Sequence, residues 1–210
     1  MTSTTSMTPT TWANGPLASF DLETTGFSPT NDALVQAACL IVGPDGEVLD
    51  GSWTSVINPG RPIPIEAIRV HGITDARARR EGMAHDEAVE RVLRYLDDVA
   101  RAAIPLVIFN APFDLGFIRA AADRQRLPIA APVVVDPLAI HRVVDPHRPE
   151  RKTLTALAAY YRCTALPTHD ARADALAAAA VARALARGHP VLASTPAGEL
   201  YRIRETWQRA

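Results

Sequence analysis

The stretch LASFDLETTG, residues 17–26, contains a candidate strand and the first candidate functional residues. Residues 17–22 are mostly apolar and run into acidic residues, so we expect a buried strand here. Asp21 and Glu23 are two positions apart, and side chains at such positions of a strand point to the same face. Two unpaired carboxylates this close are unfavourable unless they share a cation or a proton. Taken alone, such a pair is more often an acidic strand end exposed to water.

Two further strands follow in the chain. Residues 33–42 are largely apolar and end in β-branched residues, and residues 48–57 alternate between apolar and polar. The turn sequence Gly43-Pro44-Asp45-Gly46 separates them. Three strands in this order predict an antiparallel meander.

The rest of the chain alternates short strands with helices. We expect strands at residues 105–109 and 133–135. Hydrophobic spacing and capping residues predict helices at residues 65–70, 86–102, 112–126, 137–143, 154–161, 170–187 and 195–208. A meander followed by this alternation predicts an α/β or α+β domain, a mixed sheet with helices on its faces. Residues 1–15 are expected to be a disordered leader, and residues 16–210 a single domain.

Composition excludes several classes of protein. The formal net charge is −1, so the chain lacks the strongly basic field of a protein that coats nucleic acid. No segment approaches the roughly 20 apolar residues of a membrane span, and the N-terminus does not resemble a secretory signal. Cys39 and Cys163 have no metal-ligand spacing. They are expected to be reduced thiols of a cytoplasmic protein without a membrane partner.

Three more stretches contain candidate functional residues: HGIT at 71–74, NAPFD at 110–114 and HDARAD at 169–174. Asp114 falls at the start of a predicted helix, where an acidic residue can equally serve only the helix dipole. His169 and Asp174 are five positions apart at the start of another helix, so both can face one cleft. Histidine titrates near neutrality, as a general base must. Asp21 and Glu23, by contrast, have no Cys or His in their stretch, and such a donor set suits Mg²⁺ or Mn²⁺.

Taken in order, DLETTG, HGIT, NAPFD and HDARAD resemble the motifs of the DEDDh 3′→5′ exonucleases. The similarity is greatest to the proofreading (epsilon) subunit of bacterial DNA polymerase III and its stand-alone relatives, and it covers residues 17–187. It implies a ribonuclease H-like α/β fold, in which helices flank a five-stranded mixed sheet of order 3-2-1-4-5.

The resemblance also implies a reaction and its residues. Asp21, Glu23, Asp114 and Asp174 would bind two divalent cations, Mg²⁺ or alternatively Mn²⁺, and His169 would be the general base. Nucleoside 5′-monophosphates would be released from a DNA 3′ end. The implied substrate-binding residues are Leu22, Thr24, Thr25, His71, Ile73, Asn110 and Phe113. For Ile73 and Phe113, ordinary core packing is an equally good interpretation.

Other functions remain open at this point. DLETTG is closer to the DNA polymerase branch, but an RNA exonuclease similar to oligoribonuclease or ribonuclease T fits the same motifs. A non-catalytic module that binds a polymerase and a phosphohydrolase of small molecules are further alternatives. The identity of a polymerase or repair partner cannot be read from the sequence.

Overall fold

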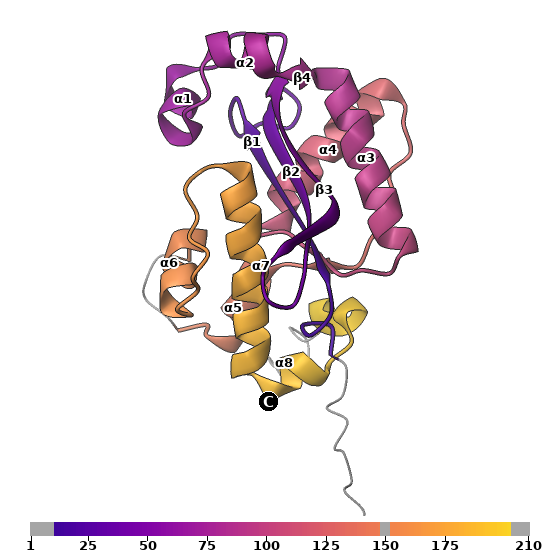
Figure 1. The fold of residues 1–210 in the computed structure, drawn as a ribbon, viewed down its shortest axis with the longest axis vertical. Coiled ribbons are helices and arrows are strands. Elements are labelled where there is room, and N and C mark those ends of the chain that lie inside the picture. The colour runs from indigo at the N-terminus through magenta and orange to yellow at the C-terminus, as the bar shows by residue number, and fades with distance from the viewer. Residues whose placement is uncertain (1–10, 148–151, 203–210) are drawn as a thin grey trace, which may run out of the picture.

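The computed structural model describes residues 11–147 and 152–202. Its strands form a mixed sheet of order β4-β3-β2-β1-β5-β6. Figure 1 labels β1 to β4 of this sheet and the helices around it. The strands are β1 (Leu17–Thr24), β2 (Leu34–Val42), β3 (Val48–Asn58), β4 (Met83–Ala84), β5 (Leu106–Val107) and β6 (Val134–Val135). The pairs β1–β2 and β2–β3 are antiparallel, whereas β1–β5, β5–β6 and β3–β4 are parallel. The predicted strand order is confirmed, and the two-residue strand β4 is added beside β3.

Helices cover both faces of this sheet. They are α1 (Ile65–His71), α2 (Asp75–Glu81), α3 (His85–Arg101), α4 (Ala111–Gln125), α5 (Pro137–Val144), α6 (Leu154–Tyr160), α7 (Ala171–Gly188) and α8 (Pro190–Ser194), followed by the 3₁₀ helix η1 (Ala197–Arg202). The prediction of one helix over residues 195–208 is wrong in the part that the structure describes. Thr195 is extended between α8 and η1, and residues 203–210 lie outside the described ranges. None of the helices described is both long and apolar enough to cross a membrane.

Alternation along β1 assigns its side chains to two different cores. Phe20 and Leu22 pack with α3 and α4 on one face. Ser19 points to the other face, where its hydroxyl donates to the Ala175 carbonyl of α7 over 2.7 Å. Because side chains alternate in a strand, Asp21 and Glu23 share that face.

The alanine-rich sequence of α7 lets this helix lie close to the sheet. Ala171, Ala175 and Ala179 form one stripe of α7 and pack against residues of β2. Small side chains of this kind reduce the distance between helix and strands. As a result, the first turn of α7 lies over the end of β1 that contains Asp21 and Glu23.

The predicted leader, residues 1–15, is too long at its C-terminal end. Trp12 Nε1 donates to the Leu192 carbonyl over 3.0 Å. The buried guanidinium of Arg183 donates to the carbonyls of Ala13 and Gly15, and also to those of residues 42 and 43. Residues 11–15 are therefore part of the folded domain, and residues 1–10 lie outside the described residues.

Candidate functional site

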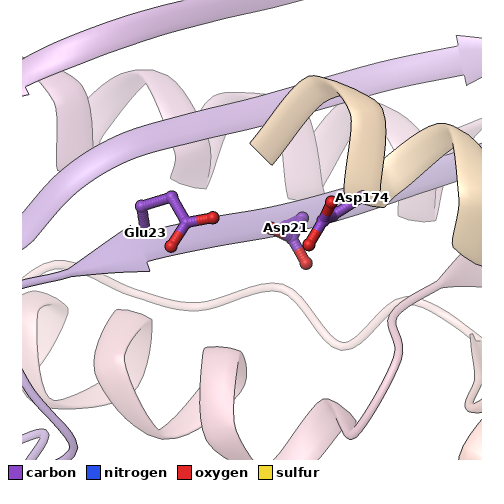
Figure 2. A group of neighbouring side chains, drawn as sticks. All are labelled: Asp21, Glu23 and Asp174. Carbon is purple, nitrogen blue, oxygen red and sulfur yellow. The ribbon is translucent and has the colours of Figure 1, made fainter. Parts of the chain in front are cut away.

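Three carboxylates meet between β1 and α7. The ligand atoms of Asp21, Glu23 and Asp174 all lie within 4.8 Å of one another (Figure 2). We call these three residues the carboxylate cluster. Asp21 and Glu23 come from one face of β1, and Asp174 comes from the first turn of α7. The cluster thus joins two segments that are far apart in the sequence.

Asp114 lies beside the cluster but is not one of its members. It is 3% exposed, and its Oδ1 accepts a hydrogen bond from Leu22 N over 3.0 Å. Strand β5 pairs with β1 only at Ala18 and Ser19, so that edge of β1 is free further along. Asp114 occupies this free edge, where its negative charge helps to raise the pKa of Asp21.

One carboxylate that the sequence interpretation missed fixes the start of α4. Asp136 accepts hydrogen bonds from the amides of Asn110 and Ala111, and from two amides at the start of α5. Asn110 has a left-handed φ of 62°. Asp136 therefore holds the turn that places Asp114. The available signal was Asp136-Pro137, an N-cap residue followed by proline at the first helical position.

His169 directly precedes Asp170, the N-cap residue of α7, and lies close to Asp174. Its side chain is exposed, and its backbone has a left-handed φ of 55°. The amides of Thr168 and His169 both donate to Asp174 Oδ1, over 2.8 and 3.2 Å. Asp174, a member of the carboxylate cluster, therefore also holds the backbone at residues 168 and 169. His169 itself is exposed to solvent.

Burial and mutual repulsion raise the pKa of each carboxyl group. Burial raises the pKa of Asp21 well above its ordinary value, and the charges of Asp114, Asp174 and Glu23 add to that shift. Burial, with Asp174 and Asp170, raises the pKa of Glu23 to about 7. The pKa values of Asp114 and Asp174 are also raised, chiefly by burial. None of the ion pairs among the described residues includes any of the four.

These properties fit a site for divalent cations. The donor atoms are all carboxylate oxygens, which suit a hard ion. A metal ion would also offset the repulsion that otherwise makes the carboxyl groups retain protons.

The raised pKa of Glu23 predicts that the stability of the metal-free protein depends on pH. The folded-state pKa is about 7, above the ordinary 4.5. Protonation of Glu23 therefore favours the folded state, and this contribution is lost as the pH rises through about 7. We expect the metal-free Tm to fall between about pH 5 and pH 8, and the stabilisation by added Mn²⁺ to grow over the same interval, because protons and cations compete.

Thermal unfolding in EDTA and in MnCl₂ across this pH range measures both trends. The control is Glu23→Gln, which removes this titrating group and should flatten the pH dependence. A wild-type metal-free Tm that rises with pH relative to the Glu23→Gln variant would contradict the expectation.

The predicted substrate residues lie around the end of β1, but their environments differ. The Thr24 hydroxyl donates to the Gly26 carbonyl, and the Thr25 hydroxyl binds the carboxylate of Asp32. Both bonds shape the loop after β1, and Leu22 is 5% exposed beside them. The His71 ring accepts a hydrogen bond from Ile73 N. Burial lowers the pKa of His71, an effect that the Thr24 backbone partly offsets, so His71 lies next to the strand end.

Ile73 lies in the core, whereas Asn110 and Phe113 are at least partly exposed. Ile73 is 1% exposed and packs in a small core with residues of β2, β3 and α2, so its side chain is not available to a ligand. Asn110 is exposed and Phe113 is half-buried. Phe113 contacts Phe27 edge-on, with ring centroids 6.4 Å apart. Phe27 is 90% exposed and was missed, although it directly follows DLETTG.

Comparisons with known proteins give one consistent result. The family model described as "RNase_T: Exonuclease" matches residues 19–182. A DNA polymerase III subunit epsilon-like protein of Rhodobacter capsulatus is 42% identical over 101 residues, which are 48% of this chain and 14% of that protein. The chain thus spans a small part of that relative's length.

Two solved structures have a similar fold. E. coli exonuclease I in complex with a dA16 oligonucleotide matches with a TM-score of 0.72 and 22% identity, over 85% of this chain and 42% of that one. Exonuclease X in complex with 5′ overhanging duplex DNA matches with a TM-score of 0.61 and 22% identity, over 88% of this chain and 99% of that one.

Proposed function

The chain belongs to the exonuclease family whose model matches residues 19–182, and from this premise we propose that it is a metal-dependent 3′→5′ exonuclease acting on DNA. The observation that best supports this proposal is that the ligand atoms of Asp21, Glu23 and Asp174 lie within 4.8 Å of one another. These residues come from β1 and α7, and Asp114 lies beside them. The products would be nucleoside 5′-monophosphates released one at a time.

In this proposal the four carboxylates hold two divalent cations, with Mg²⁺ favoured and Mn²⁺ as the alternative. When bound, such cations lower the pKa of a water molecule and stabilise the charge on the reacting phosphate. His169 accepts the proton of the attacking water on a ring nitrogen. Its exposure lets the imidazole pass that proton to solvent and become neutral again before the next cycle.

The 3′-terminal nucleotide of the DNA would lie between the loop after β1 and the start of α4. Leu22 and Thr24 at the end of β1, with Thr25 directly after it, would border this nucleotide on one side, and Asn110 would border it on the other. His71 would border the terminal nucleotide. The pair Phe27 and Phe113 offers aromatic faces, and stacking of bases on aromatic rings depends little on sequence. Ile73 would act only by supporting His71 from the core.

The names of similar proteins favour DNA over RNA as the substrate. The polymerase subunit and the two oligonucleotide complexes are each described in terms of DNA. The name of the Rhodobacter relative also suggests a polymerase as the partner, and a repair partner is the alternative. Cys39 and Cys163 are both free thiols, in agreement with a cytoplasmic protein.

A cleavage assay with chelation tests this function. We expect a 5′-labelled DNA oligonucleotide to be shortened in single-nucleotide steps with Mg²⁺ or Mn²⁺, and shortening to stop in EDTA and resume when metal is restored. A matched RNA oligonucleotide should be cleaved more slowly.

Each other outcome identifies a different function. Activity that persists in EDTA contradicts a metal-dependent enzyme. Faster cleavage of RNA makes the protein an RNA exonuclease, and hydrolysis of a nucleotide ester without cleavage of either polymer makes it a small-molecule phosphohydrolase. Metal binding with no cleavage at all would leave the non-catalytic interaction module.

A further inference from the structure

Gln36 joins the sheet to the helix that contributes Asp174. It lies on β2 directly opposite Glu23 of β1 and is 4% exposed. Cross-strand partners share one face of a sheet, so Gln36 points toward α7, as Glu23 does. Its amide is satisfied on both sides. Nε2 donates to Asp170 Oδ2 over 2.9 Å, and Oε1 accepts from Ala171 N over 3.0 Å.

Asp170 connects Gln36 to the first turn of α7 by hydrogen bonds. It is the N-cap residue, and its Oδ1 accepts from the amides of Arg172 and Ala173 over 3.1 and 3.2 Å. One oxygen of Asp170 therefore binds the helix and the other binds Gln36 of the sheet. Asp170 also accepts, through its carbonyl, the hydrogen bond of Asp174 N over 2.9 Å.

The apolar contacts of α7 do not fix the position of its first turn along the helix axis. The stripe of Ala171, Ala175 and Ala179 packs on small and branched residues of β2. Methyl groups in such a stripe define the distance between helix and strand better than they define the position along the helix axis. Directional hydrogen bonds to a buried amide fix that position, since a displacement would leave polar groups unsatisfied.

We propose that Gln36 is a positioning residue that sets where Asp174 and His169 lie relative to Asp21 and Glu23. It would act through its hydrogen bonds to Asp170 and Ala171 N and not as a ligand itself. His169 has a left-handed backbone, and its amide donates to Asp174. The first turn of α7 follows directly, and there Ala171 N donates to Gln36. These two contacts hold the His169 backbone in place. The catalytic part of this inference rests on the proposed function, whereas its part in metal binding can be measured separately.

An exchange of donor and acceptor tests the proposal. Gln36→Glu keeps the side chain's size and its bond to Ala171 N, but it places a carboxylate against that of Asp170. Asp170→Asn keeps a capping oxygen and places an amide donor against the amide donor of Gln36. The double variant Gln36→Glu/Asp170→Asn restores a donor–acceptor pair with the local charge unchanged.

We expect each single variant to lower kcat by about 10- to 100-fold, the scale of effect for a misplaced reacting group. KM for the oligonucleotide should change by less than about 2-fold. Mn²⁺ affinity, measured by calorimetry without substrate, should weaken by about 10-fold in the single variants. The double variant should recover most of both kcat and affinity. Val92→Ala, on the α3 side of the sheet, is the control for simple destabilisation: it should lower the Tm and leave Mn²⁺ affinity unchanged.

Wild-type kcat and Mn²⁺ affinity in the single variants would overturn the proposal. A folded double variant that recovers neither quantity would also overturn it. If a single variant does not fold, the double variant decides alone, because only a positioning pair predicts its recovery. If the wild-type protein cleaves no oligonucleotide, the proposed function fails, and the affinities still decide whether Gln36 positions the carboxylates.

Discussion

Asp21→Ala is expected to reduce nucleotide release by about 10³-fold or more, because a bound metal ion contributes several kcal/mol to the transition state and each 1.36 kcal/mol is tenfold. Asp21 has the most carboxylate neighbours of the four. Asp114, Asp174, Glu23 and Asp170 all raise its pKa, so its oxygens lie where a shared cation would be bound. Mn²⁺ affinity should fall together with the rate.

The same substitution should not destabilise the metal-free protein. Removal of one half-buried acid relieves repulsion among the others, so the Tm in EDTA should stay equal or rise. This combination distinguishes a lost ligand from a misfolded chain. Asp50→Ala, at an exposed position of β3, is the matched control and should change neither quantity. Near-normal cleavage by Asp21→Ala would remove Asp21 from the metal site.

His169→Ala is expected to slow the reaction by about 10²- to 10⁴-fold, the range for loss of a general base. Mn²⁺ affinity should change little, since the contact of His169 with Asp174 is made by its backbone amide. Single-turnover rates on the labelled oligonucleotide would report the chemical step, and calorimetry would report metal binding.

The backbone of His169 calls for a specific control. Its φ of 55° is a conformation that asparagine adopts more readily than alanine does. His169→Asn therefore preserves the turn while removing the imidazole, and it should be as slow as His169→Ala. If His169→Asn were fast, the loss in the alanine variant would come from the backbone and the base would have to be reassigned. His147→Ala, at an exposed position in a loop, controls for histidine removal in general.

The sequence predicted the features that local pattern determines. The apolar runs of the long strands were located correctly. The two-residue strand β4 was not predicted, because so short a segment has no periodicity. Residues 11–15 resembled a leader because their contacts are made with Arg183 and Leu192, far along the chain.

The site was predictable as a set of residues but not as a geometry. The order of the motifs indicated which carboxylates to compare, and the structure brings three of them together with Asp114 at their side. The parts played by Asp136 and Gln36 depend on partners that are distant in sequence. Ile73 could not be assigned to core or surface from its spacing alone, and only its 1% exposure decides for the core.

The contribution of α7 to the carboxylate cluster also has a consequence during synthesis of the chain. Asp21 and Glu23 are translated before Asp174 and before the alanine stripe that covers their face of the sheet. A nascent chain still attached to the ribosome cannot assemble the site until this helix has emerged. The carboxylate cluster is therefore a feature of the packed sheet and helix together, and no shorter stretch that ends before α7 contains it.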